Sequence, residues 1–156
     1  MIVNSMQTMR QAHWHRFQIL TRRSARLRAL APVLTWSSNV WQGVSVENSA
    51  HVHRIADLQR VPAAVRFLSL EPLLGSIPEL PLDGIDWVIV GGESGPIRRE
   101  MRPEWVREIH DQCESAGVAF FFKQWGGRVA KSGGREFDGR TWDEMPTPVN
   151  RVNASL

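Results

Sequence analysis

The chain has few of the features that would place it outside the class of ordinary globular proteins. Its single cysteine, Cys113, excludes a disulfide within the chain and a metal site made of cysteines alone. It has no run of about 18 apolar residues, so the sequence predicts no membrane span. Residues 1–11 lack the apolar core of a signal peptide, which favours a cytoplasmic location.

Acidic residues are absent from residues 1–46, while the remainder holds 13 basic and 16 acidic residues. A basic block of this kind either attracts phosphate-bearing ligands or nucleic acid, or is a solvated helix face. The block consists of six arginines: Arg10, Arg16, Arg22, Arg23, Arg26 and Arg28.

The length of 156 residues suits one domain but falls well short of the roughly 250 residues of a complete eight-stranded barrel. Short apolar runs alternate with helical patterns, which is typical of parallel βα units. We therefore predict an α/β fold: a partial, open parallel βα barrel of about five strands over residues 1–125. The expected strands are residues 16–20, 40–46, 65–70, 86–91 and 118–123.

Three helices are predicted between these strands. The clearest begins at Pro103 and ends before Gly117. A second begins with Asn48 as its cap and runs to about Arg60, and a third lies over residues 24–31. The positions expected to face the core are Trp105, Ile109, Cys113 and Ala116, then Val52, Ile55 and Ala56, then Leu27, Leu30 and Ala31.

Residues 126–156 break the alternation and form a C-terminal extension. A β-hairpin is predicted near residues 136–142, because Asp138-Gly139 lies between two short β-prone runs.

Polar residues follow all five expected strands. In a parallel barrel the loops at the carboxyl ends of the strands build the active site, so these residues are expected to line one shared opening. The candidate cofactor-binding or substrate-binding residues are Ser45, Glu47, Asn48, Ser69, Glu71, Gly91, Gly92, Glu93, Ser94, Lys123 and Gln124.

Each of these residues also has a structural interpretation. Glu47 could simply favour the positive end of the following helix, and Lys123 could belong to an ion-pair network. In the functional interpretation, the carboxylates of Glu47, Glu71 and Glu93 hold cations or hydrogen-bond donors such as ribose hydroxyls or an amino group. Gly91 and Gly92 would allow a ligand to approach the backbone closely.

The histidines predict no metal site. His51 and His53 are two positions apart on a predicted helix and point to different sides of it. His13 and His15 precede a strand, at the amino-terminal end of the strands and away from the candidate site.

Long motifs occur in order at residues 39–48, 65–75, 86–95, 120–126 and 134–144. Together they resemble the phage-associated "gp thirty-seven/gp sixty-eight" family of unknown function. The resemblance covers roughly residues 9–146. It implies a barrel similar to those of radical S-adenosylmethionine enzymes, with S-adenosylmethionine and a [4Fe–4S] cluster held by an N-terminal cysteine-rich loop.

This chain departs from that family because it lacks the cluster cysteines, so no cofactor is expected in this chain alone. We expect an N-terminally truncated protein, in which residues 2–6 do not form a neighbouring parallel strand, because too few residues follow them for a crossover. Strand 16–20 would then have an open edge that pairs with a second copy of the chain or with a partner protein.

Three functions follow from these observations. The first is a truncated radical-SAM-like protein of unknown substrate that keeps the strand-end binding residues and is inactive alone. The second is a nucleic-acid-binding accessory protein that uses the basic N-terminal block. The third is one part of a split enzyme.

Overall fold

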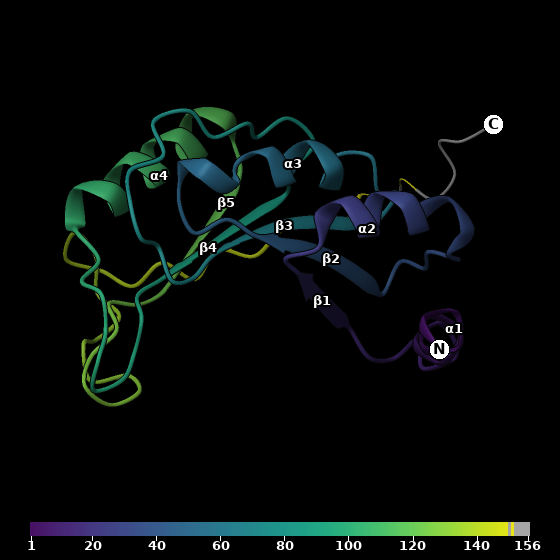
Figure 1. Ribbon diagram of the computed structural model, residues 1–156, viewed down its shortest axis with the longest axis horizontal. Coiled ribbons are helices and arrows are strands. Elements are labelled where there is room, and N and C mark those ends of the chain that lie inside the picture. Colours follow the sequence, from purple (N-terminus) through teal and green to yellow (C-terminus); the bar gives the residue numbers. More distant parts are fainter. Residues whose placement is uncertain (150, 152–156) are drawn as a thin grey trace.

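The fold is organised around one open sheet of five parallel strands, shown in Figure 1. The computed structural model describes residues 1–149 and 151. The strand order follows the sequence, and every observed strand boundary lies within one residue of its predicted position. The predicted α/β fold is therefore confirmed, with the sheet not closed into a barrel. The strands are β1 (Phe17–Thr21), β2 (Val40–Ser45), β3 (Val65–Leu70), β4 (Trp87–Gly91) and β5 (Ala119–Gln124).

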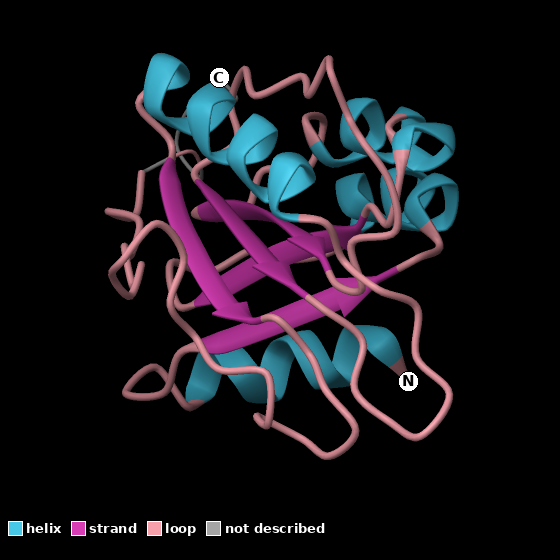
Figure 2. Ribbon diagram, turned by 90° about the vertical axis from the view of Figure 1, so that its left-hand side faces the viewer, coloured by secondary structure: helices cyan, strands magenta, loops and turns pink. Residues whose placement is uncertain are grey.

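Three helices, α2, α3 and α4, cover one face of the sheet, as Figure 2 shows. No helix joins β3 to β4, where residues 71–86 cross in a loop. Among the described residues, no helix combines the length and the hydrophobicity that a membrane crossing needs. The helical elements on this face are α2 (Ser24–Leu30), the 3₁₀ turn Ala31–Val33, the 3₁₀ turn Ser49–His51, α3 (His53–Leu58) and α4 (Pro103–Ala116).

Helix α4 begins and ends as its sequence predicts. Pro103 occupies the first turn, where its missing N–H costs nothing, and Gly117 ends the helix with a left-handed φ of 67°. The Val118 amide donates to the Cys113 carbonyl at 2.9 Å, which satisfies one of the last carbonyls. One expected core position is wrong: Ala116 is exposed, because the apolar stripe shifts to Val106 at the start of the helix.

The segment after β2 forms a short 3₁₀ turn and then α3, rather than one continuous helix. Asn48 caps this turn as predicted, since its Oδ1 accepts from the Ala50 amide at 3.0 Å. Ile55 is fully buried, but Ala56 is exposed and not buried as expected. Asp57 takes the inward position, where it accepts a 2.7 Å hydrogen bond from Ser24 Oγ of α2.

The sheet is buried on both faces along its central strands, which explains their nearly continuous apolar sequence. The face under the helices carries the main core, which includes Val44, Leu68 and Val88. The opposite face, here called the concave face, carries a second core cluster of Trp41, Val65, Phe67 and Trp87.

Residues 2–6 do not form a strand, as expected; they lie within helix α1 (Ile2–Gln11). In Figures 1 and 2, α1 lies beside β1 and away from the other three helices. Met6 buries its side chain in the main core. Asn39 Nδ2 fixes the end of the helix by donating to the Met9 carbonyl at 2.8 Å and the His15 carbonyl at 2.9 Å. Within the described residues β1 pairs only with β2.

The C-terminal extension packs along β5. The predicted hairpin turn is present, with Phe137 and Arg140 paired around Asp138 and Gly139. The following residues run antiparallel to β5, and Phe121 pairs with Asp143. Residues 150 and 152–156 of the expected extension lie outside the described residues.

Candidate functional site

A cavity of about 540 Å³ opens on the concave face, toward the carboxyl ends of the strands. Four of the predicted site residues line it, and they come from β3, from β5 and from the loop that begins after β3. These four are Ser69, Glu71, Lys123 and Gln124. The structure therefore brings part of the predicted set together.

An ion pair between Glu71 and Lys123 forms the polar rim of this cavity. Lys123 Nζ lies 2.9 Å from Glu71 Oε1 and 3.2 Å from Glu71 Oε2. Both side chains remain partly open to solvent, with 52% of Lys123 and 26% of Glu71 exposed. Gly91, at the end of β4, makes room for the pair, because a Cβ there would lie 3.2 Å from the Glu71 carboxyl carbon.

The floor of the cavity is aromatic and aliphatic. Trp87 of β4 stacks edge-on with Phe121 at a ring separation of 5.8 Å, and Phe67 lies 5.9 Å from Trp87 on the other side. Ile89 completes the floor. Phe67 fits here because Gly43 of the neighbouring β2 has no side chain, and a Cβ at that position would overlap the Phe67 ring. The site thus combines an apolar surface with a charged rim.

Gly92 serves the chain itself rather than an approaching ligand. A Cβ at Gly92 would overlap the Trp125 carbonyl, and the Gly92 amide donates to the Gln124 carbonyl at 2.8 Å. Gln124 Nε2 in turn donates to Ser94 Oγ at 3.2 Å. These contacts hold the end of β4 against the end of β5, so they position the rim.

Glu47 lies outside the lining of this cavity and is satisfied by other side chains. Its buried carboxylate is 3.0 Å from Arg22 Nε and 2.9 Å from Arg54 Nη1. His51 Nδ1 approaches it to 3.1 Å, without the alignment of a hydrogen bond. Glu47 therefore ties the loops after β1 and β2 to each other and to α3. This arrangement favours the structural interpretation of Glu47.

The neighbours of Glu47 are also used within the chain. The Ser45 carbonyl accepts a 2.7 Å hydrogen bond from Arg54, and the Asn48 side chain caps the 3₁₀ turn. Neither residue lines the cavity.

Glu93 forms a separate ion pair away from the cavity. Its carboxylate accepts from Arg99 Nη2 at 2.9 Å and from the Arg99 backbone amide at 2.9 Å. These hydrogen bonds lower the pKa of Glu93 to about 2. Glu93 thus stabilises the conformation of its own loop. The sequence predicts that the three carboxylates lie in one opening, but in the structure only Glu71 lines the cavity. Each of the three carboxylates pairs with basic side chains of its own, so the three need not lie together to share a cation.

Two charged residues of the cavity lining have no counterpart in the prediction, Lys131 and Arg135, and both lie on the loop after β5. Arg135 Nε donates to the Lys123 carbonyl at 3.1 Å, and its guanidinium pairs with Asp143. The loop could not be placed from apolar patterning because it has none. The sequence did hold one signal: Lys131 and Lys123 are the only lysines in the chain.

Part of the basic N-terminal block makes contacts within the fold. Arg22 pairs with Glu47, Arg28 pairs with Asp57 at 3.1 Å, and the Arg16 guanidinium lies 4.3 Å from the Trp41 ring centroid. Half of the six arginines therefore have structural partners, which weakens the case for a nucleic-acid surface.

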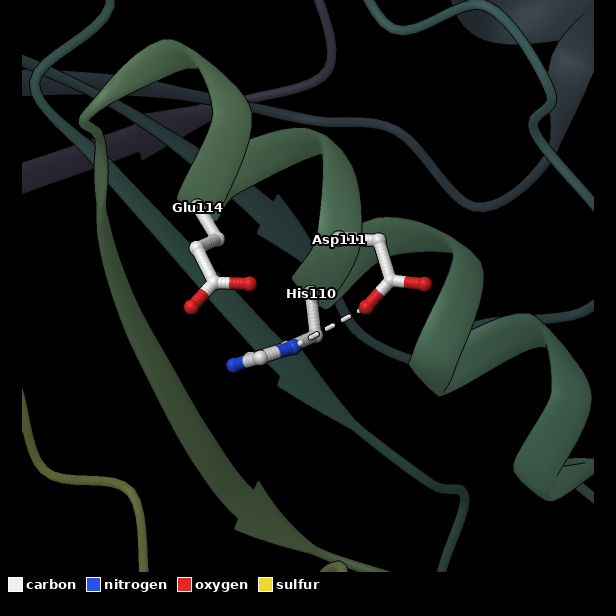
Figure 3. A group of neighbouring side chains, drawn as sticks. All are labelled: His110, Asp111 and Glu114. Carbon is white, nitrogen blue, oxygen red and sulfur yellow. Dashed lines mark hydrogen bonds and ion pairs between the residues drawn. The ribbon is translucent and has the colours of Figure 1, made fainter.

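One group of close metal-ligand side chains occurs among the described residues, and it lies on α4 (Figure 3). His110 Nδ1 is 3.3 Å from Asp111 Oδ1, and Glu114 lies one turn further along. All three come from one helix, and Asp111 and Glu114 are exposed. His110 packs against Trp142 at a ring separation of 4.3 Å, so its place is explained by packing. We assign no metal to this group.

A larger hollow of about 780 Å³ lies at the opposite end of the sheet, between α4 and the C-terminal segment. Its lining includes Cys113 and Glu144, near the amino ends of the strands. In parallel α/β folds ligands bind at the carboxyl ends, so the smaller cavity on the concave face is the better candidate.

The fold and the cavity define an open parallel α/β protein with a candidate binding site at the carboxyl ends of its strands. The family described as a protein of unknown function, DUF5131, matches residues 1–146, and the chain belongs to this family. No curated protein and no solved structure matches the chain.

Proposed function

We propose that the concave-face cavity binds S-adenosylmethionine or a closely similar nucleoside, and that this chain is the ligand-binding part of a radical-SAM-like barrel. The resemblance of its motifs to the phage-associated family motivates the proposal. The observation that carries it is the Glu71–Lys123 pair above an aromatic floor, because this combination suits a flat ring joined to a polar end.

The size and lining of the cavity support a ligand of this class. Its volume of about 540 Å³ lies within the range of roughly 300–1,000 Å³ that is usual for small-molecule sites. Phe121, which is partly exposed, offers aromatic surface for the adenine ring, and the nearly buried Phe67 and Trp87 line the cavity with it.

Glu71 supplies the acceptor that such a ligand needs. A carboxylate accepts hydrogen bonds from ribose hydroxyls or from the ammonium of an amino acid, whereas it repels a carboxylate. Lys123 orients Glu71 through its hydrogen bonds, and Ser69 offers a hydroxyl in the same cavity lining. Glu71 is therefore proposed as the ligand acceptor and Lys123 as its positioning residue.

An iron–sulfur cluster does not fit the residues of this chain. A [4Fe–4S] cluster needs several thiolates, and Cys113 is the single cysteine. Cys113 lies on the buried side of α4, and this burial raises the pKa of its thiol to about 12, with a further contribution from Glu144. We therefore propose that the chain binds the nucleoside but does not carry out radical chemistry by itself.

Titration calorimetry with S-adenosylmethionine tests the binding proposal. Glu71→Gln is expected to weaken binding about tenfold or more, because it removes a charged acceptor. The matched control is Asp138→Asn, which breaks an exposed ion pair with Arg107; neither residue lines the cavity, so this variant should leave affinity unchanged. Absence of binding to the wild-type chain would refute the proposal.

Anaerobic reconstitution with iron and sulfide tests the statement about the cluster. We expect no stoichiometric [4Fe–4S] absorbance from the wild-type chain. Stoichiometric absorbance that disappears in Cys113→Ala would contradict it.

A further inference from the structure

Both lysines of the chain line the concave-face cavity. The chain holds 19 basic lysine and arginine residues, and 17 of them are arginine. The two exceptions, Lys123 and Lys131, come from β5 and from the loop after it. Lysine is a compact charge on a flexible stem and binds phosphate or carboxylate as a point charge, which distinguishes it from arginine.

Lys131 is held by a loop with a tightly packed stem. A Cβ at Gly127 would overlap Ser132, and a Cβ at Gly133 would overlap the Gly126 carbonyl. Ser132 Oγ also donates to the Val129 carbonyl at 2.8 Å.

Lys131 itself adopts a left-handed φ of 67°, which is uncommon for a residue with a side chain. The loop therefore presents Lys131 from a fixed base, at a place where glycine would be easier to accommodate.

The charges that line the cavity do not balance. Glu71 is neutralised by Lys123, and Arg135 pairs with Asp143. Within the described part of the chain, Lys131 has no ion-pair partner, so one positive charge faces the cavity without a counterion. A ligand that supplies a negative charge would complete the site.

We infer that the ligand of this cavity carries an anionic group, a phosphate or a carboxylate, and that Lys131 binds it. This inference rests on the proposed function, because it names the chemistry of the ligand of the same cavity. The two side chains then have separate tasks. Glu71 accepts from hydroxyl or ammonium groups of the ligand, and Lys131 donates to its anion.

Calorimetric titrations with three probes test this inference: adenosine, adenosine 5′-monophosphate and S-adenosylmethionine. Adenosine is neutral, the monophosphate presents a phosphate, and S-adenosylmethionine presents a carboxylate. The wild-type chain is expected to bind at least one of the two anion-bearing probes about tenfold more tightly than adenosine. The probe whose affinity falls in Lys131→Met identifies the anion as phosphate or carboxylate, because S-adenosylmethionine also carries an ammonium group that can donate to Glu71.

Lys131→Met should weaken the binding of that probe about tenfold and leave adenosine binding unchanged, while Lys131→Arg should keep most of the affinity. The matched control is Arg128→Met, because Arg128 belongs to the same loop but does not line the cavity. A loss of affinity in Arg128→Met as large as that in Lys131→Met would overturn the inference. It would show that positive charge anywhere on the loop strengthens binding, without a contact from Lys131.

Equal affinity of the wild-type chain for all three probes would overturn the inference and leave the proposed function standing. No binding of any probe would refute the proposed function, and the inference with it.

Discussion

Lys123 Nζ and Glu71 Oε1 lie 2.9 Å apart, and their contact joins β5 to the loop after β3 across the end of β4. Between them, Gly91 of β4 has no side chain that would fill the space. The contact lies at the rim of a cavity whose floor is aromatic. It can be a structural ion pair or a group prepared for a ligand, and its effect on stability separates the two.

Lys123→Met is expected to change the free energy of unfolding by less than about 1 kcal/mol, because half-exposed ion pairs contribute little in water. Urea unfolding followed by tryptophan fluorescence measures this difference. A loss of about 3 kcal/mol would mark the pair as a structural element and weaken the proposed binding role.

Gly92→Ala is expected to destabilise the fold by about 3 kcal/mol, since the new methyl group would overlap the Trp125 carbonyl, which is backbone and cannot turn away. Gly75→Ala is the matched control, because a Cβ there lies at an ordinary 3.6 Å from the Asn48 Cβ. Thermal unfolding of both variants checks the prediction. Equal stability of the two variants would show that the ends of β4 and β5 are not packed as described.

Cys113 should react very slowly with a thiol reagent at pH 8 in the native protein and rapidly in denaturant. Burial first, and Glu144 second, raise the pKa of its thiol to about 12, so almost no thiolate is present at that pH. The reagent releases an absorbing thiolate when it reacts, and the absorbance of that thiolate follows the reaction. Fast reaction of the folded chain would contradict both the burial of Cys113 and the argument that it cannot ligate iron.

Glu93 should titrate near pH 2, below the ordinary value of 4.5, because Arg99 donates hydrogen bonds to its ionised form. The interaction is therefore fully present above about pH 4.5 and is lost as the pH falls toward 2. Carboxyl-carbon NMR shifts of Glu93 report its titration, and Arg99→Gln should raise the midpoint toward 4.5, although the backbone amide of residue 99 can still donate to the carboxylate. A wild-type midpoint near 4.5 would show that the loop is not fastened by this pair.

The sequence predicts the sheet well because the strands are buried on both faces and bounded by turn residues. It also predicts α4, since Pro103 and Gly117 mark its ends. It misplaces Ala56 and Ala116 because the small alanine side chain fits a helix surface as well as a core.

The candidate site was harder to predict than the sheet. Glu47, Glu71 and Glu93 all follow strands, but only contacts with Arg22, Lys123 and Arg99, which lie from 6 to 52 residues away in the chain, decide which of them faces a cavity. Lys131 escaped prediction because an irregular loop carries it, and no periodic pattern shows which way such a loop turns.

The most direct test of the binding proposal is methyl NMR of the isoleucine-labelled chain, titrated with S-adenosylmethionine. Ile89 lies on the cavity floor, whereas Ile55 and Ile109 are fully buried under the helices on the other face of the sheet. The proposal predicts a saturable shift of the Ile89 methyl signal, with Ile55 and Ile109 nearly unmoved. A titration that leaves the Ile89 signal unchanged would contradict it.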